Sequence, residues 1–583
     1  MKKKIYRQLK KIFTKKHHGI LDLDFYTTWY SDVKSLSTEQ ASEHWRRFGH
    51  NEGRHPNFDS FLASQKLTIG SLPIDFDWAF YCNHYLDLKQ AGINNRFRAV
   101  VHYLKYGQKE GRICSPYNDF QKKHLGDFPE ANQQAIDTIV DEINNNPRET
   151  GLDEFLGDKM KAFWQAKEAE LTDLAKLHAT QGPSVRASLL NETSTAVDFI
   201  ADSFKKAFLA LSEPLKTRIN ARRVLIVGDF FLPQCIRYRI EQKLEQLNQS
   251  GYEATAVSWT LPGKIFKELA FHDIVIFYRT PALPDIVRAI VYARALGKLT
   301  FYEIDDLLFE PIYPPPIESY GLDVTEERYL GLLKGMALYH NAAKLCEFGI
   351  ASTQPLVERL GKLVESGTCF LHRNGLDSQN GDWSGNKSDK AFVDIFYGSG
   401  TQAHNSDFIE IALPALIFIM EKYHDVRLVV VGYLDLPGEF VDKFSQQLVR
   451  FPLLKHLPSY WNLLLNADIN IAVLERNEIN DCKSELKWFE AACFKIPSVV
   501  SKTANYEQVI VQGVDGIMVG TTEEWVSALE SLIIDPTKRE EIGSNAYRQV
   551  HARYSLEKLS ANIDGIIQSA VKAKINTQND ARP

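Results

Sequence analysis

Two stretches of the chain repeat one pattern, in which short apolar runs alternate with longer amphipathic segments. In the first stretch, runs typical of buried parallel strands lie at 224–228, 254–259, 273–278, 299–304, 349–352 and 368–372. In the second, they lie at 392–397, 426–431, 469–474 and 497–500. Helical periodicity separates them, notably at 284–296, 326–346, 407–423 and 484–493. We therefore expect two doubly wound α/β domains, 221–390 and 391–560, whose strand ends face each other across a cleft.

The segments on either side of these domains have a mainly helical pattern. Residues 119–220 are polar and helical with two breaks, which predicts a helical connector. A helical pattern over about 523–574 closes the chain, and we assign 561–583 as a C-terminal helix and tail. With 583 residues, of which 44% are hydrophobic, the chain is too long for one small module and too apolar for general disorder.

Residues 21–118 contain an internal duplication. FYTTWYSDV at 25–33 recurs as FYCNHYLDL at 80–88, and HWRRFGHNEGR at 44–54 recurs as HYLKYGQKEGR at 102–112. Each copy predicts a short aromatic helix, a connection, and a second helix that ends at a glycine. We expect the aromatic residues to pack the copies together, while a binding role for the repeated Glu-Gly-Arg is the alternative.

A basic head precedes the duplication. Residues 1–18 carry eight basic side chains and no acidic one, although the whole chain has a net charge of −6: Lys2, Lys3, Lys4, Arg7, Lys10, Lys11, Lys15 and Lys16. Four apolar residues fall at helical spacing among them, as a helix lying on an anionic membrane requires. A solvated terminus is the alternative. Charge confined to 1–20 argues against a nucleic-acid-binding surface.

Cysteine content and apolar run lengths indicate the compartment. The seven cysteines form no CxxC pair, which favours a reducing cytoplasm over a disulfide framework or a zinc site. No apolar run approaches the roughly 18 residues of a membrane span, and the head lacks the apolar core of a signal peptide. We expect a cytoplasmic protein bound peripherally to the inner face of the cytoplasmic membrane.

Three segments carry candidate chemistry. The turn Gly398-Ser399-Gly400-Thr401 follows the first strand of the second domain, where glycines let backbone approach a phosphate. It lacks the Walker and GxGxxG patterns, so ATP hydrolysis and conventional NAD binding lose support. Lys483 and Ser484 begin a predicted helix, with Ser484 as its cap, and Glu490 lies further along it. A lysine can neutralise phosphate and a carboxylate can bind a ribose diol, although an ordinary solvated helix face has the same pattern.

The third segment is acidic and ends a strand of the first domain. Asp305 and Asp306 could orient sugar hydroxyls, hold an arginine, or contribute to a divalent metal site, for which they supply few ligands. We favour an acceptor-side or structural role and expect no metal site. Basic partners follow neighbouring strands: Arg237, Arg239 and Arg279.

The motifs YEIDDL (302–307), FYGSGT (396–401) and KSELKWFEAA (483–492) resemble those of bacterial GT-B glycosyltransferases. The resemblance covers about 221–560. The chain is similar to glycosyltransferase family 4, especially to enzymes of O-antigen, capsule or surface-layer glycan assembly. The duplicated module resembles modules attached to such enzymes. It implies metal-independent, cofactor-free transfer from a nucleotide sugar with retention, onto a lipid-linked or oligosaccharide acceptor, with protein partners for the module.

The resemblance also implies site roles. The second domain would bind the donor, with Glu490 on the ribose and with Lys483, Ser484 and the 398–401 turn near the diphosphate. The acceptor would lie against the first domain.

One departure concerns the family's first glutamate, because Cys482 stands in its place. The nearest charged residues on its C-terminal side are Lys483 and Glu485, so our catalytic candidates are Lys483, Glu485, Asp305 and Asp306. His272, His340 and His404 receive no catalytic role. Two alternatives stay open: a metal-dependent GT-A transferase, and an inactive carbohydrate-binding or assembly protein.

Overall fold

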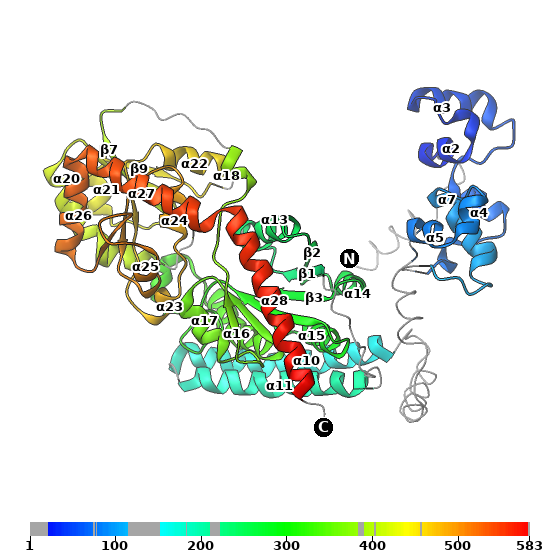
Figure 1. Cartoon of the computed structure of the whole chain (residues 1–583), viewed down its shortest axis with the longest axis horizontal. Coiled ribbons are helices and arrows are strands. Elements are labelled where there is room, and N and C mark those ends of the chain that lie inside the picture. Colours follow the sequence, from blue (N-terminus) through cyan, green and yellow to red (C-terminus); the bar gives the residue numbers. More distant parts are fainter. Residues whose placement is uncertain are drawn as a thin grey trace, which may run out of the picture. The chain divides into compact units, whose positions relative to one another are not determined.

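The computed structural model describes residues 21–73, 76, 78–114, 152–181, 184–209, 222–382, 390–400, 404–454 and 457–580. The chain forms two compact units, residues 1–128 and 129–583 (Figure 1). The predicted basic helix within 1–20 and part of the predicted connector lie outside the described residues.

The first unit is helical and consists of two similar halves. Its elements are α2 (Leu23–Trp29), η1 (Ser31–Val33), α3 (Thr38–His44), η2 (Trp45–Gly49), α4 (Phe58–Ser64), η3 (Ile69–Ser71), α5 (Trp78–His84), α6 (Leu86–Gln90), α7 (Arg96–His102) and η4 (Tyr103–Gly107). In each half a buried tyrosine hydroxyl is hydrogen-bonded to a histidine Nδ1: Tyr26 to His44 at 3.1 Å, and Tyr81 to His102 at 3.0 Å. The duplication in sequence is therefore a duplication in structure.

The repeated glycines are needed because these tyrosines lie directly against them. A Cβ on Gly49 would lie 2.2 Å from the hydroxyl of Tyr26, and a Cβ on Gly107 would lie 2.2 Å from the hydroxyl of Tyr81. Any side chain there would displace the ring and its hydrogen bond. These two glycines are thus explained by packing.

The arginine of each repeated Glu-Gly-Arg is held within its own half. Arg54 makes a two-pronged ion pair with Asp32, with a shortest distance of 2.7 Å, and Arg112 does the same with Asp87 at 2.8 Å. Each guanidinium also lies over a tyrosine ring of its half, within 4.9 Å of the ring centroid. The arrangement supports a structural role for this motif.

Aromatic rings also join the two halves. Phe97 of the second half lies 5.3 Å from Phe25 and 4.9 Å from Phe58 of the first, measured between ring centroids. The tyrosines and histidines described above instead pack within each half. Only some of the aromatic residues therefore pack the two halves together, as the sequence predicted; the others pack within one half.

The second unit contains two six-stranded parallel sheets. The first has the order β2-β1-β3-β4-β5-β6, with β1 (Arg223–Gly228), β2 (Glu253–Ser258), β3 (Ile274–Tyr278), β4 (Leu299–Ile304), β5 (Phe348–Ala351) and β6 (Cys369–Leu371). The second has the order β12-β11-β10-β7-β8-β9, with β7 (Val393–Ser399), β8 (Val426–Gly432), β9 (Leu448–Phe451), β10 (Ile469–Ala472), β11 (Ser498–Ser501) and β12 (Ile517–Val519). The order in which strands are added reverses between β1 and β3 in one sheet and between β7 and β10 in the other.

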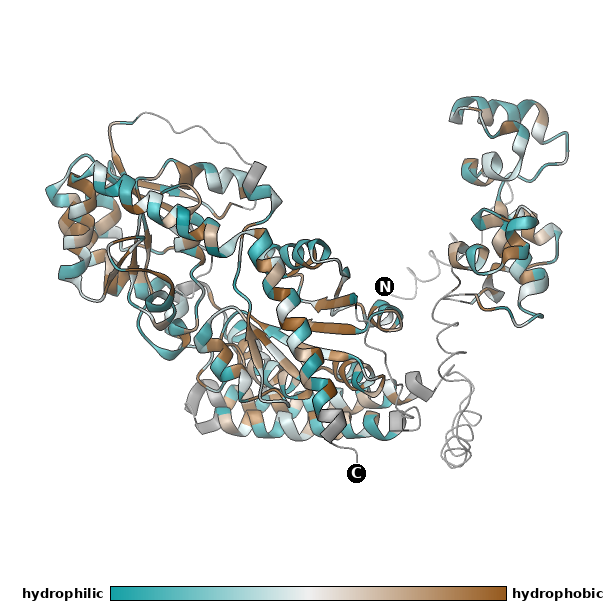
Figure 2. Cartoon of the chain, in the orientation of Figure 1, coloured by the Kyte–Doolittle hydropathy of each residue, from teal (hydrophilic) through white to brown (hydrophobic). Residues whose placement is uncertain are grey.

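Helices cover both faces of each sheet (Figure 1). Those of the first domain are α12 (Pro233–Cys235), η6 (Ile236–Glu241), α13 (Gln242–Gln249), α14 (Pro262–Leu269), α15 (Pro284–Ala295), η7 (Ile317–Asp323), α16 (Glu326–Leu345), α17 (Gln354–Gly361) and α18 (Ser378–Asp382). Those of the second are α19 (Asn405–Asp407), η9 (Phe408–Ala412), α20 (Leu413–Lys422), α21 (Gly438–Lys443), α22 (Leu457–Leu465), α23 (Glu478–Asp481), α24 (Leu486–Ala492), α25 (Ala504–Val509), α26 (Thr522–Ile534) and α27 (Pro536–Tyr554). Figure 2 shows the apolar residues gathered on the strands between these layers.

Two segments outside the predicted first domain belong to its packing. Helices α10 (Leu152–Gln181) and α11 (Ser184–Leu209) form a hairpin against α15 and α16. The last helix, α28 (Leu556–Asp580), returns from the second domain and buries Ile563, Ile566 and Ile567 in the core of the first sheet. The described part of the predicted connector is therefore a layer of the first α/β domain.

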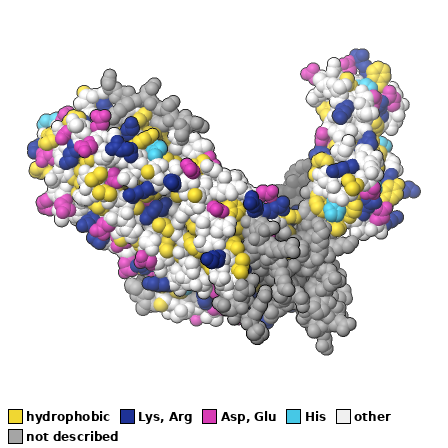
Figure 3. All heavy atoms as spheres, in the orientation of Figure 1, with side chains coloured by type: hydrophobic (Ala, Val, Ile, Leu, Met, Phe, Trp, Pro, Cys, Tyr) yellow, Lys and Arg dark blue, Asp and Glu magenta, His cyan; other side chains and the backbone are white. Residues whose placement is uncertain are grey.

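The fold expected from sequence is confirmed: a GT-B-like pair of doubly wound parallel-sheet domains preceded by a mainly helical region. The prediction missed β9 and β12, which are short and form the two edges of the second sheet. None of the described helices is long and apolar enough to cross a membrane. On the face drawn in Figure 3, basic and acidic side chains are interspersed.

Candidate functional site

The candidate site lies where the carboxyl ends of the two sheets meet. Asp305 and Asp306 follow β4, and Arg279 follows β3, beside the point where the first sheet reverses. The 398–400 turn ends β7 and Lys483 follows β10, on either side of the corresponding point in the second sheet. Open parallel sheets bind ligands at such points because the loops leave in opposite directions and open a crevice.

Arg279 holds the two acids of the first domain together. Its guanidinium pairs with Asp305 and, at 2.7 Å, with Asp306. Its backbone has φ of 48°, a conformation that costs a non-glycine residue roughly 1–3 kcal/mol, and its N–H donates to the carbonyl of Glu303 at 3.0 Å. The strained turn aims the guanidinium at the acids, and Tyr278 donates to Asp305 at 3.2 Å.

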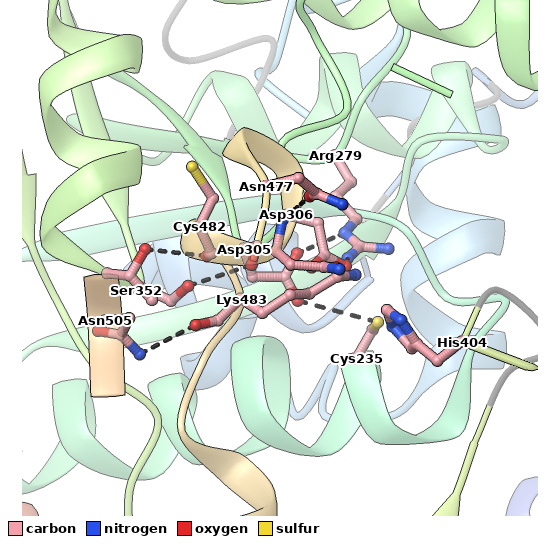
Figure 4. A network of polar contacts seen from close by, with 12 residues as sticks. Cys235, Arg279, Asp305, Asp306, Ser352, His404, Asn477, Cys482, Lys483 and Asn505 are labelled. Carbon is pink, nitrogen blue, oxygen red and sulfur yellow. Dashed lines mark hydrogen bonds and ion pairs between the residues drawn. The ribbon is translucent and has the colours of Figure 1, made fainter. Parts of the chain in front are cut away.

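Lys483 reaches these acids from the other domain. Its Nζ lies 2.9 Å from Oδ1 of Asp306, so one ion pair spans the two α/β domains (Figure 4). Burial alone would raise the pKa of the Asp306 carboxyl, but the charges of Lys483 and Arg279 outweigh it and hold that pKa below its ordinary value. Asp306 is therefore ionised, and the sequence-predicted cation and acid are neighbours.

The backbone around Lys483 is fixed from both domains. Its carbonyl accepts from Asn505 Nδ2 at 2.9 Å, and the carbonyl of Cys482 accepts from the hydroxyl of Thr353 in the first domain at 3.0 Å. The expectation that Ser484 caps a helix is wrong. Helix α24 begins at Leu486, its N-cap is Glu485, and no side chain caps it, so Lys483 stands in the turn before the helix.

Glu485 lies in a buried ion pair away from the aspartates. It accepts from Arg373, in the segment that joins the domains, at 3.0 Å and from Asn505 at 2.8 Å, and it is 3% exposed. These bonds use both carboxylate oxygens. The arrangement suits a residue that positions the turn carrying Lys483 rather than one that contacts substrate.

Glu490 faces the first domain across the cleft. Tyr238 donates to its Oε1 at 2.6 Å and Tyr460 to its Oε2 at 3.3 Å. Burial raises the pKa of this carboxyl, although the two hydroxyls and nearby Arg237 oppose the shift. A diol could take the place of the two tyrosine hydroxyls, because both present oxygen-bound hydrogens to the same carboxylate.

Packing explains two glycines at the ends of β7 and β8. A Cβ on Gly398 would lie 2.8 Å from the hydroxyl of Tyr460, and one on Gly432, which has φ of 103°, would lie 1.9 Å from the carbonyl of Ser399. Gly400 approaches Gln234 of the first domain, with 3.8 Å from its Cβ position to the amide nitrogen. Thr401 lies outside the described residues.

Two of the three predicted basic partners lie elsewhere. Arg237 pairs with Asp377 at 2.7 Å and lies over the ring of Trp461, which places it where the chain crosses between domains. Arg239 is 1% exposed and pairs with Glu303 beneath the first sheet's edge. Only Arg279 of the predicted trio contacts Asp305 and Asp306.

Two further residues lie near Lys483: His404, which received no catalytic role from the sequence, and Lys487, which was not singled out. His404 lies beside Cys235 and the Asp305 network (Figure 4) and is hydrogen-bonded to Asp407. Lys487 lies over the ring of Tyr397, 4.6 Å from its centroid. The sequence offered one usable sign, a histidine shortly after the glycine turn. Within the described residues, no group of three or more His, Cys, Asp or Glu side chains is arranged to hold a metal.

Comparison with known proteins adds a family match in the second domain. Residues 416–564 match a family described as "Glycosyl transferase-like", which covers about a quarter of the chain. No curated protein matches. The family match and the paired-domain fold support a glycosyltransferase of GT-B architecture.

Solved structures with similar folds are distant. HepE of Anabaena, in complex with UDP and glucose, is 13% identical with a TM-score of 0.41, covering 60% of this chain and 100% of that one. Sucrose-phosphate synthase of Thermosynechococcus elongatus is 11% identical with a TM-score of 0.42 and the same coverage. A TarM mutant of S. aureus is 11% identical with a TM-score of 0.37 over 50% of this chain, which spans 54% of its length. Likenesses this weak carry no argument about activity.

Proposed function

We propose that the chain is a retaining glycosyltransferase that moves a sugar from a nucleotide-sugar donor to a growing, lipid-linked cell-surface polysaccharide. The observation that carries the proposal is the ion pair between Lys483 and Asp306, at 2.9 Å. It brings a cation of one sheet edge and an acid of the other to one point, where a donor and an acceptor would meet.

The donor binds to the second domain in this proposal. The ribose diol takes the place of the tyrosine hydroxyls on Glu490, and the diphosphate lies between the 398–400 turn and Lys483. At Gly400 the nearest atom to a Cβ would be 3.8 Å away, which leaves room for a phosphate to approach the backbone there. The match of residues 416–564 to the glycosyl transferase-like family falls on this same domain.

Catalysis depends on charge at the leaving group. When the bond between the sugar and the diphosphate breaks, negative charge accumulates on the diphosphate, and a preorganised Lys483 lowers the energy of that state without a metal ion. The acceptor hydroxyl approaches from the first domain, where Asp305 and Asp306 accept hydrogen bonds from sugar hydroxyls. Activity that survives EDTA would support metal independence.

In this proposal the duplicated module and the basic head determine where in the cell the enzyme is located. The head binds an anionic membrane surface on the cytoplasmic side, and the module contacts protein partners or glycan. Deleting residues 2–18 should move the protein from the membrane to the soluble fraction on fractionation. An unchanged distribution would refute the anchor and leave the transferase proposal intact.

A panel of UDP-, GDP-, dTDP- and CMP-sugars tests the activity. Binding is measured by thermal shift, and turnover by release of the free nucleotide, first with water and then with a synthetic lipid-linked acceptor. NMR of the product identifies the anomeric configuration, and inversion would contradict the retaining mechanism. The fold argues against the GT-A alternative, because the chain has two α/β domains, each with a complete six-stranded parallel sheet.

A further inference from the structure

His404 and Asp407 form a dyad at the edge of the cleft. Nδ1 of His404 lies 3.0 Å from Oδ2 of Asp407, and both side chains are largely buried, at 14% and 9% exposed. The same aspartate oxygen accepts from Asn480 Nδ2 at 3.3 Å, which fixes its orientation. Because the carboxylate can only accept, Nδ1 carries the hydrogen, and Nε2 is left for other partners.

Charged groups of both signs surround this histidine. Lys483 and Lys487 act on it from the segment around α24, and Asp407 pairs with it from its own helix. Asp306 from the loop after β4 and Cys235 from α12 belong to the same network (Figure 4). Burial raises the pKa of the Cys235 thiol to about 11, so that group is neutral. Two lysines therefore lie near His404, and their charges are opposed by Asp407 of the same domain and by Asp306 of the first domain.

Burial lowers the pKa of His404, and the two lysines add to that effect against the opposing pull of Asp407. The imidazole is therefore neutral in the ligand-free protein near pH 7. An anion within hydrogen-bonding reach favours the charged form and raises the pKa of such a group by roughly 1–3 units. A diphosphate next to Lys483 and Lys487 would supply that anion.

We infer that His404 takes up a proton when the diphosphate of the nucleotide sugar enters the cleft, and that the imidazolium then completes a three-cation cradle with Lys483 and Lys487. This inference rests on the proposed function. The proton comes from solvent on binding and returns to solvent when the free nucleotide leaves. During transfer Nε2–H donates to a diphosphate oxygen, no bond to His404 forms, and the electron pair of the broken sugar bond stays on the leaving oxygen.

Calorimetry in buffers of different ionisation enthalpy measures the proton uptake directly. The full-length protein is titrated with UDP-glucose, GDP-mannose and dTDP-glucose at about pH 7, in PIPES and in imidazole, because the diphosphate diester of these probes does not itself titrate there. We expect uptake of a sizeable fraction of a proton with the probe that binds. His404→Gln should abolish the uptake and weaken binding about tenfold, the effect of one charge-assisted hydrogen bond.

The matched control is His551→Gln. His551 is exposed on α27 and its Nδ1 bonds the carbonyl of Tyr547, so this variant should retain wild-type uptake and affinity. Asp407→Asn serves as the second variant: it removes the charge that favours imidazolium, so uptake should appear only at lower pH. A purely structural dyad would change affinity without moving that pH profile.

The outcomes separate the two proposals. If a probe binds to the wild-type protein with no proton uptake, or if His404→Gln keeps the uptake, the inference about His404 is wrong and the transferase proposal stands. If none of the nucleotide sugars binds, the proposed function fails and this inference fails with it. Far-UV circular dichroism and the melting temperature show whether each variant folds.

Discussion

The two α/β domains share an architecture and differ in the charge that they place at the cleft. The first presents Asp305 and Asp306, held by Arg279, and the second presents Lys483 and Lys487. In the ligand-free structure two of these opposite charges, Lys483 and Asp306, form an ion pair. A nucleotide sugar would replace Asp306 as the partner of the second domain's cations, which frees the acid for an acceptor hydroxyl.

The difference lies in the loops rather than in the sheets. The strand orders differ, β2-β1-β3-β4-β5-β6 against β12-β11-β10-β7-β8-β9, yet in both the candidate site residues lie in connections near the point where the order reverses. A parallel sheet therefore sets where a site can be, and the loop residues set which charge it carries. The following substitutions test this division between an acidic and a cationic face.

Removal of the Lys483 charge from the second domain should have the largest effect on sugar transfer. Lys483→Ala is expected to lower kcat for sugar transfer roughly 100- to 1000-fold, the loss seen when one preorganised partner of a developing oxyanion is removed. The measurement is nucleotide release under saturating donor. Lys502→Ala is the control, since Lys502 is 50% exposed and pairs with Glu507 on the same domain; an equal loss there would mean that general charge matters.

Glu490→Gln should weaken donor binding by roughly ten- to a hundredfold, because a carboxylate that accepts two hydrogen bonds from a diol becomes a neutral amide with one acceptor oxygen. Tyr460→Phe removes only a 3.3 Å bond to the same residue and should change binding little. Calorimetry with the donor identified from the panel gives both affinities. Equal affinity in the Glu490→Gln variant would remove this residue from the donor site.

The cationic face should also respond to pH. Burial lowers the pKa of Lys487 to about 8, so its charge is present below that pH and is lost above it. Affinity for the anionic donor should therefore fall as pH rises above about 8, by up to about tenfold per pH unit. In Lys487→Gln the affinity should be lower at pH 7 and nearly flat above pH 8. A parallel decline in both proteins would assign the pH dependence to another group.

A substitution on the acidic face gives the smallest predicted change, and it should raise donor affinity where the others lower it. Asp306→Asn releases Lys483 from its ion pair, and we expect donor affinity to rise by up to about fivefold, because a partly exposed pair contributes about 1 kcal/mol or less. Transfer to the acceptor should fall at the same time. Asp198→Asn, which breaks an exposed pair with Lys344, should change neither quantity, and weaker donor binding in Asp306→Asn would contradict the competition between acid and donor.

The sequence predicted the two-domain fold because buried parallel strands are continuous apolar runs with clear ends. The run at 299–304 coincides with β4, and 326–346 agrees with α16 to within one residue. The strands β9 and β12, which stand at the two edges of the second sheet, were not predicted. In β9 the exposed Arg450 interrupts the apolar run, and none of its residues is fully buried.

The site was predictable where charged side chains lie in the connections that leave the carboxyl ends of the strands. Asp306 and Lys483 were expected near the ligand, and the structure brings them into contact. Arg239 also follows a strand, but it turns inward to Glu303, which sequence spacing cannot reveal. His404 and Asp407 are only three residues apart, but the position of Lys487 near them depends on the tertiary fold, which places Lys487 over the ring of Tyr397 in β7.

The most direct test of a cationic donor face is calorimetric titration of the wild-type protein and the Lys483→Ala variant with UDP-, GDP-, dTDP- and CMP-sugars. The account predicts that at least one nucleotide sugar binds the wild-type protein and that Lys483→Ala weakens that binding at least tenfold, with its melting temperature unchanged. Binding of no nucleotide sugar, or equal binding by the two proteins, would contradict it.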